Sequence, residues 1–182
     1  MTPTGALIMS VFAAIWWTVG LRAAGHGPAL VYLPPLGVTL ALAGSAWRLA
    51  RPEQARMNNA WDAAEAARRD RLVMWASVGE GVMLFLVAGI LLPSTGHRDA
   101  TVSAIALIVG AHFVPLARGL PARAYYLTAT GLIALGVGGF GVRDLALRIT
   151  IVTTGAAVIL WLTALGALRH GADQSEIQQT VA

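Results

Sequence analysis

The sequence predicts an all-α integral membrane protein with six transmembrane helices. Of its 182 residues, 57% are hydrophobic and only 12% are charged, and the mean hydropathy is +0.67. A soluble domain normally carries about 25% charged residues. The charged side chains also lie between long apolar runs, and each run reaches the roughly 20 residues that a helix needs to cross the hydrocarbon core. The expected helices span residues 5–24, 28–50, 72–93, 101–118, 122–141 and 147–168.

Charged residues mark the boundaries of these helices in chain order. The first helix is expected to stay in the protein, because its first five residues carry no basic side chain and its apolar run is too long for a signal peptide. The third run, residues 72–97, contains Glu80 as its only charged side chain, and the fourth contains His112. The runs without Asp, Glu, Lys or Arg are residues 1–21, 23–47, 100–117, 124–142 and 149–168.

The distribution of arginine predicts the orientation in the membrane. With the N-terminus inside, nine of the 13 Arg residues fall on the cytoplasmic side and four on the outer side. This bias satisfies the positive-inside rule, so both termini are expected to be cytoplasmic. The chain is rich in Ala and Arg and has no Lys, which is typical of a GC-rich bacterial genome. The expected location is therefore the bacterial inner membrane.

Two polar segments lie outside the expected membrane core. The cytoplasmic loop, residues 51–70, is rich in Ala, Glu, Gln and Arg, which favour a helix. Such a helix would lie on the membrane surface or extend the third membrane helix. The polar C-terminal tail, residues 171–182, is expected to be loose. Residues 1–182 are expected to form a single membrane domain.

The two halves of the chain resemble each other. Residues 79–88, GEGVMLFLVA, match residues 155–164, GAAVILWLTA, at five of ten positions. The second and fifth helices both begin with Pro-Ala, followed by Tyr-Leu and by two similarly spaced glycines. These matches predict a 3+3 repeat. Because each unit has an odd number of helices, the two units would have inverted topology and would place a site near the midplane between them.

Glu80 is the leading candidate for a functional residue. A carboxylate at the centre of a membrane helix costs about 2.5–3.5 kcal/mol on insertion scales, so it is expected to face protein and to find a partner. The predicted partner is His112. Glu80 lies nine residues after Arg71, and His112 lies six residues before Arg118, so the two side chains have similar depths on helices joined by a short turn. Ser77 precedes Glu80 by about one helical turn.

Pro115 follows His112 by three residues and removes a backbone donor from its helix. The freed carbonyl of Ala111 would add an acceptor beside the pair. Glycines on both sides of Glu80 would allow another helix to approach closely. The residues expected to line a pocket or to bend its helices are Trp16, Trp17, Trp75, Pro34, Pro35, Pro115, Tyr125 and Tyr126.

The composition excludes several kinds of chemistry. The sequence pI is about 10.6, but the basic residues are all Arg and lie at helix ends, so no nucleic acid partner is expected. The absence of Lys excludes a lysine Schiff base, and the absence of Cys excludes disulfides and thiolate metal sites. No His-x-x-x-His or Glu-x-x-His spacing indicates a metal. Neither a cofactor nor enzymatic activity is expected.

The leading functional interpretation is a small transporter or channel-like protein of the bacterial inner membrane. Protons would be coupled through Glu80 and His112 to the movement of an unidentified small molecule or ion. Two alternatives remain: a sensor or assembly module acting through residues 51–70, and a structural protein whose Glu–His pair only joins two helices. A homodimer in the lipid bilayer is compatible with the sequence, although no single GxxxG face requires it.

Overall fold

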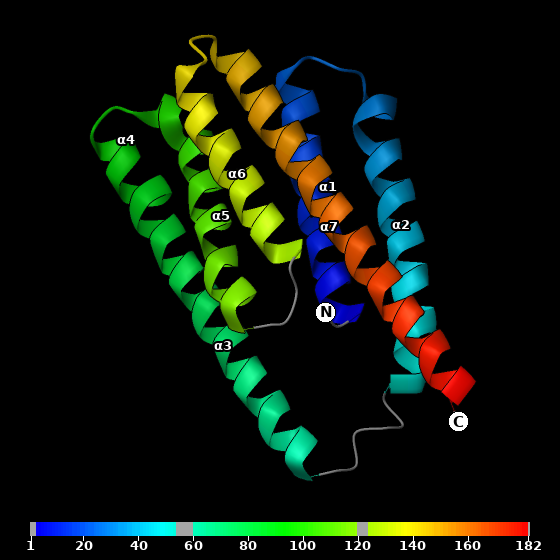
Figure 1. The fold of residues 1–182 in the computed structure, drawn as a ribbon. Helices are drawn as coiled ribbons and strands as arrows, with labels where there is room; N and C mark the ends of the chain where they lie inside the picture. Colours follow the sequence, from blue (N-terminus) through cyan, green and yellow to red (C-terminus); the bar gives the residue numbers. More distant parts are fainter. Residues whose placement is uncertain (1–2, 54–59, 120–123, 182) are drawn as a thin grey trace.

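The computed structural model describes residues 3–53, 60–119 and 124–181, and every regular element within these ranges is helical (Figure 1). The elements are α1 (Pro3–Ala23), α2 (Pro28–Glu53), α3 (Ala60–Leu84), the π-helical η1 (Phe85–Leu91), α4 (Leu92–Ser94), the short 3-10 helix η2 (Arg98–Ala100), α5 (Thr101–Gly119), α6 (Ala124–Gly141) and α7 (Leu145–Val181). Because α3, η1 and α4 follow one another without a break, they form one rod, and the chain folds as six long helical rods.

The described residues contain apolar helices compatible with a multi-pass membrane protein. Five helical segments are long and apolar enough to span a membrane, and a shorter apolar segment, Val31–Ser45 of α2, makes a sixth candidate. The five spans are Gly5–Ala23, Ala67–Ser94, Arg98–Arg118, Ala124–Gly141 and Leu145–Gly166. They coincide with the segments predicted from the spacing of charged residues, because charged side chains are rarely tolerated inside the hydrocarbon core.

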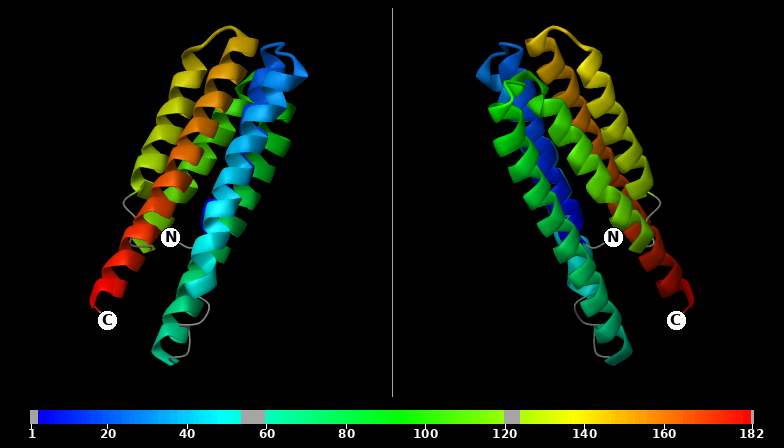
Figure 2. Two further views of the ribbon diagram at one scale, coloured as in Figure 1. Left: turned by 90° about the vertical axis from the view of Figure 1, so that its right-hand side faces the viewer. Right: turned by 90° about the vertical axis from the view of Figure 1, so that its left-hand side faces the viewer.

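Four rods form the centre of the bundle, and two lie outside it. α7 packs along α1 and α6, and α5 packs along α6. α2 lies mainly on α1, and α3 lies mainly on α5. Figure 2 shows this arrangement from two further sides, with both termini near the same end of the bundle. The rod containing α3 is therefore supported chiefly by one neighbouring helix.

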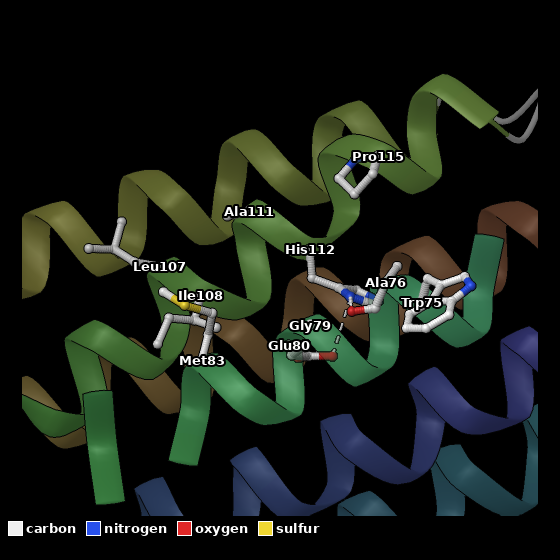
Figure 3. A pocket seen from close by; sticks show the side chains of 10 residues that line it. All are labelled: Trp75, Ala76, Gly79, Glu80, Met83, Leu107, Ile108, Ala111, His112 and Pro115. Atoms are coloured by element: carbon white, nitrogen blue, oxygen red, sulfur yellow. Dashed lines mark hydrogen bonds and ion pairs between the residues drawn. The ribbon is translucent and has the colours of Figure 1, made fainter. Parts of the chain in front are cut away.

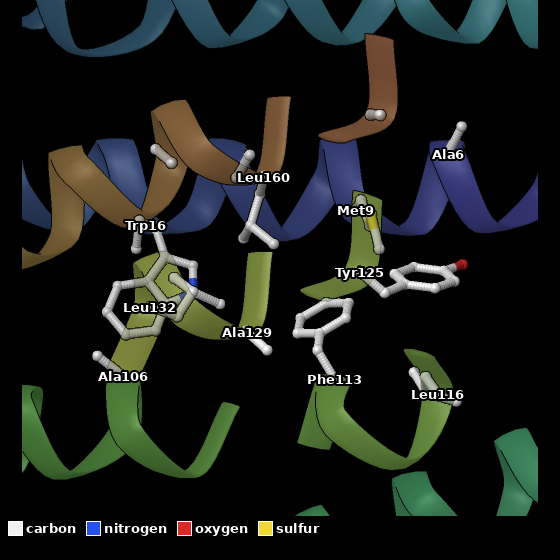
Figure 4. Packing of buried hydrophobic residues seen from close by; sticks show 14 of the residues in the cluster. Ala6, Met9, Trp16, Ala106, Phe113, Leu116, Tyr125, Ala129, Leu132 and Leu160 are labelled. Atoms are coloured by element: carbon white, nitrogen blue, oxygen red, sulfur yellow. The ribbon is translucent and has the colours of Figure 1, made fainter. Parts of the chain in front are cut away.

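Small side chains allow the central helices to pack closely. The buried core of the described residues contains eight alanines: Ala6 and Ala13 of α1, Ala106 and Ala117 of α5, Ala129 of α6, and Ala156, Ala157 and Ala164 of α7. Without a strong hydrophobic effect inside lipid, close backbone approach and dispersion contacts hold membrane helices together. The larger side chains of Trp16, Phe113 and Tyr125 fill the space between these helices (Figure 4).

The glycines of α6 differ in what surrounds them. A Cβ atom on Gly136 would lie 2.8 Å from the Ser103 carbonyl oxygen and 2.9 Å from the Leu107 backbone nitrogen, both in α5. A Cβ atom on Gly139 would also come too close to its neighbours, which are the side chains of Ser103 in α5 and Val152 in α7. A Cβ atom on Gly138, in contrast, would have no described atom within 4 Å. Gly136 and Gly139 therefore set the distance of α6 from its neighbours, and Gly138 does not.

Arg148 joins the first turn of α7 to two loops at the same end of the bundle. Its side chain is buried, and its Nε donates to the Val142 carbonyl oxygen at 2.8 Å. Its Nη1 donates to the Asp99 carbonyl oxygen at 2.8 Å and lies 3.2 Å from the Asp99 carboxylate. Asp144 caps α7 by accepting from the Leu147 backbone N–H at 2.7 Å.

The two polar segments are more helical than the sequence alone indicated. The tail is not loose, because α7 continues to Val181. Its Gln, Glu and Ala residues favour a helix, and extending an existing helix avoids the cost of nucleation. Residues 60–70 extend α3, which confirms the second of the two arrangements expected for the cytoplasmic loop. Residues 54–59 of that loop lie outside the described ranges.

We expect Gly136→Ala to weaken packing between α5 and α6 by about 1–3 kcal/mol, because the added methyl group meets backbone atoms that cannot move aside. Gly138→Ala is the matched control in the same helix. It should leave stability unchanged or raise it by up to about 1 kcal/mol, since Ala is the better helix former. Unfolding of the purified protein in mixed micelles measures both effects. Equal stabilities for the two variants would contradict this account of α6.

Candidate functional site

An open groove of about 460 Å³ lies between α3 and α5 (Figure 3). α3 contributes Trp75, Ala76, Gly79, Glu80 and Met83 to its lining. α5 contributes Leu107, Ile108, Ala111, His112 and Pro115. On each helix these positions recur every three or four residues, so they form one face of the helix. The groove is therefore the seam along which the outer rod lies on the bundle.

Glu80 and His112 meet in this groove, as the sequence predicted. Nδ1 of His112 lies 3.4 Å from Oε2 of Glu80 and 3.1 Å from the carbonyl oxygen of Ala76. The His112 side chain is 10% exposed, and the Glu80 side chain is 22% exposed. Glu80 also lies near the middle of its membrane span, Ala67–Ser94. The pair is thus an intramembrane contact that joins α3 directly to α5.

The geometry assigns the proton on the imidazole ring. Both atoms near Nδ1 are oxygens, and the Ala76 carbonyl oxygen can only accept a hydrogen bond. We therefore place a hydrogen on Nδ1, which donates it to the Ala76 carbonyl oxygen, while Glu80 lies within ion-pair distance of the ring. In the neutral ring, Nε2 is then an acceptor, and protonation of Nε2 creates an imidazolium beside the carboxylate. The pair can exist in several protonation states without changing its partners.

The backbone around the pair is irregular on both helices. Pro115 lies inside α5 and has no N–H to donate to the Ala111 carbonyl, so this carbonyl remains an available acceptor beside the groove. On the other rod, α geometry changes to π geometry at η1, five residues after Glu80. π segments are rare and often occur near functional sites. Both irregularities lie close in sequence to the titratable pair.

The structure brings together only part of the predicted site. Trp75 and Pro115 line the groove with Glu80 and His112. Ser77 is exposed on α3 and is not among the lining residues. A Cβ atom on Gly79 or Gly81 would have no described atom within 4 Å, so neither glycine marks a close approach of a helix. Instead, the missing side chain at Gly79 leaves space within the groove.

The other aromatic residues and prolines named from the sequence lie elsewhere. Trp16 and Tyr125 are buried in the central bundle, where Tyr125 stacks on Phe113 with ring centroids 5.7 Å apart. Tyr126 is 47% exposed. Pro34 and Pro35 lie within the continuous helix α2. These residues support the fold or face outward, and none of them lines the α3–α5 groove.

A second open groove, of about 690 Å³, lies where α7 meets α1 and α6. Trp17 lines it, with its ring centroid 5.5 Å from that of Trp161, and Thr150 and Thr154 supply its only polar side chains apart from the indole. No ionisable residue is among its lining residues. Trp17 is the only lining residue of this groove that the sequence analysis expected to line a pocket, because the others are ordinary for a membrane helix.

The described residues contain no group of three or more His, Asp or Glu side chains that could hold a metal ion. A single Glu with a single His falls short of the three or four protein ligands that zinc sites use. The arrangement is suited instead to accepting, holding and releasing protons. In comparisons with family models, curated proteins and solved structures, the chain has no significant match.

We expect Glu80→Gln and His112→Gln to be coupled in a double-mutant cycle. Residues in direct contact typically show interaction energies of about 0.5–3 kcal/mol. The measurement is unfolding of the purified single and double variants in mixed micelles. A second cycle, which combines Glu80→Gln with Thr163→Val, is the control because Thr163 pairs with Thr128 in a different helix contact. Additive effects in the first cycle would contradict an energetic contact between Glu80 and His112.

Proposed function

We propose that this protein is a small membrane transporter or channel-like protein that couples its action to protons through Glu80 and His112. The observation that carries the proposal is the contact between these two side chains in an open intramembrane groove, 3.4 Å apart. Ionisable residues at this depth are costly, and in membrane proteins they commonly mark ion pathways and proton relays. A purely structural pair would not need an open groove around it.

The packing of α3 gives the pair a means to change the structure. An ionised Glu80 lies within ion-pair distance of His112 and holds α3 against α5. When Glu80 takes up a proton, it loses its charge, and the charge-assisted part of this contact is lost. Because α5 is the main neighbour of α3, the change is not masked by contacts with other helices. Proton uptake therefore alters the stability of one packing of α3 relative to another.

The two grooves also support the predicted 3+3 inverted repeat. In the alignment that matches residues 79–88 with 155–164, Gly79 corresponds to Gly155, and Met83 to Ile159. Gly79 and Met83 line the groove between α3 and α5. Their counterparts Gly155 and Ile159 line the second groove, beside α7. The first groove then lies between helices of different halves, and the second lies where α7 meets α1 of the other half and α6 of its own half. In the same alignment Glu80 corresponds to Ala156, so only one of the two grooves carries a charge.

We further propose that the protein lies in a bacterial inner membrane with both termini in the cytoplasm. The two termini and the first turns of α3 lie toward the same end of the bundle (Figure 1). Arg68, Arg69 and Arg71 follow those first turns, at the start of the third membrane span. Clustered arginines near membrane helix ends favour the cytoplasmic side.

Proton flux into sealed vesicles tests the proposed function. Vesicles containing the full-length chain, an internal pH dye and a potassium–valinomycin clamp should dissipate a pH gradient faster than vesicles containing Glu80→Gln. The expected difference is at least about tenfold, because Glu80 is the carboxylate that exchanges the proton. Asp99→Asn is the matched carboxylate-to-amide control, and its flux should equal the wild-type flux. Equal flux for the wild type and Glu80→Gln would overturn the proposal.

One observation favours a second candidate function, a sensor or assembly module. The rod that carries Glu80 continues from the groove to Ala60, beyond its membrane span, which begins at Ala67. A shift of this rod on α5 would therefore move its outer end as well. If the protein is such a module, the wild-type chain shows no Glu80-dependent proton flux. Scrambling residues 60–66 should then remove a partner protein that copurifies with the wild-type chain. Unchanged Glu80-dependent flux after scrambling would exclude this candidate.

A further inference from the structure

Apart from the indole N–H of Trp75, the polar groups of the α3–α5 groove accept hydrogen bonds. Glu80 offers a carboxylate, His112 offers Nε2 of its neutral ring, and the Ala111 carbonyl lacks the donor that Pro115 removed. The Nδ1 hydrogen of His112 is already donated to the Ala76 carbonyl oxygen. The groove therefore favours a ligand that brings positive charge or hydrogen-bond donors, and it disfavours an anion.

The rest of the groove is apolar. Met83, Leu107 and Ile108 form its walls away from the pair, and Trp75, which is 67% exposed, lies beside Ala76 toward one end (Figure 3). An indole ring attracts a cation to its face. The volume of about 460 Å³ falls within the range of sites for small organic molecules. A bare inorganic cation would leave these walls without contacts.

The groove opens on the outer side of the bundle at membrane depth. Both helices that form it are within membrane spans, and Trp75, Gly79, Ala111 and Pro115 are exposed in its lining. A ligand that enters from the side must first dissolve in the hydrocarbon core. Strongly hydrated ions do so poorly, whereas a cation whose charge is shielded by apolar groups does so readily.

We propose that the α3–α5 groove binds a hydrophobic organic cation, with Glu80 as its counter-ion and Trp75 as its aromatic wall. This inference rests on the proposed function and names the substrate class of the same site. The cation and a proton compete for Glu80. In each exchange, one monovalent cation binds as one proton leaves the carboxyl group for water, so the net charge of the groove is conserved.

The competition fixes the direction of the pH dependence. α5 is the helix packed against Glu80, and among its titratable side chains His112 faces Glu80 while Arg118 lies exposed six residues away. Acid protonates Glu80, and the loss of its negative charge disfavours a bound cation. Raising the pH removes this proton and favours the bound cation. Affinity therefore increases with pH.

Tetraphenylphosphonium is a suitable probe, because tetraphenylborate has the same shape and the opposite charge. Calorimetry on the full-length protein in detergent, with empty micelles subtracted, should give saturable binding of the cation and no saturable binding of the anion. Affinity should rise with pH, because deprotonation of Glu80 restores the counter-ion. Glu80→Gln should lower affinity at least about tenfold, which corresponds to roughly 1.4 kcal/mol. Glu80→Asp should restore part of it.

The second groove provides the matched controls. Thr154→Val alters that groove without removing a charge and should leave affinity unchanged, whereas Trp75→Leu should lower it severalfold. Because Trp75 is largely exposed, its replacement should not impair folding. Equal binding by the wild type and Glu80→Gln, or saturable binding of tetraphenylborate, would overturn the inference. If proton flux then still depends on Glu80, the substrate class alone is wrong; if it does not, the proposed function fails too.

Discussion

A carboxylate inside the hydrocarbon core needs compensation for its lost hydration, and this constraint determines how the outer rod sits on the bundle. Glu80 meets the constraint through His112 on the neighbouring helix, and the imidazole also reaches the Ala76 carbonyl. The same three groups thus satisfy a buried charge and fix α3 against α5. Because α3 has few other supports, the charge state of two side chains has an effect on helix packing that would be small in a tightly enclosed core.

The helices of the central bundle, unlike α3, pack closely against several neighbours. α1, α5, α6 and α7 meet through alanines and glycines, and positions such as Gly136 leave no room for even one methyl group. Arg148 adds hydrogen bonds that join the α7 start to the neighbouring loops. Such packing resists continuous deformation, since interiors are close to crystal density. The described helices therefore form a closely packed central bundle, and the rod containing α3 lies beside it with fewer supports.

The two lateral grooves make the chemistry of the site easier to interpret. Both are open, and equivalent glycines of the aligned segments line them, yet only the α3–α5 groove has ionisable residues. An apolar groove facing lipid is ordinary in a membrane bundle and is filled by acyl chains. A groove lined by a carboxylate and an imidazole differs from it, because buried polar groups are costly unless they are hydrogen-bonded or paired. The difference between the grooves therefore carries more information than either groove alone.

The sequence by itself determined the helical class with long apolar segments and the approximate bounds of the helices, and it named His112 as the candidate partner of Glu80. Segregated charge and helical rise are local properties, so spacing along the chain was sufficient for these. Only the tertiary structure decided that the pair lies in a lateral groove, that Trp75 and not Trp16 stands beside it, and that Gly136 rather than Gly79 is the site of close packing. These outcomes depend on how each helix is rotated against its neighbours, and an apolar membrane sequence contains little information about rotation because lipid and protein accept the same side chains.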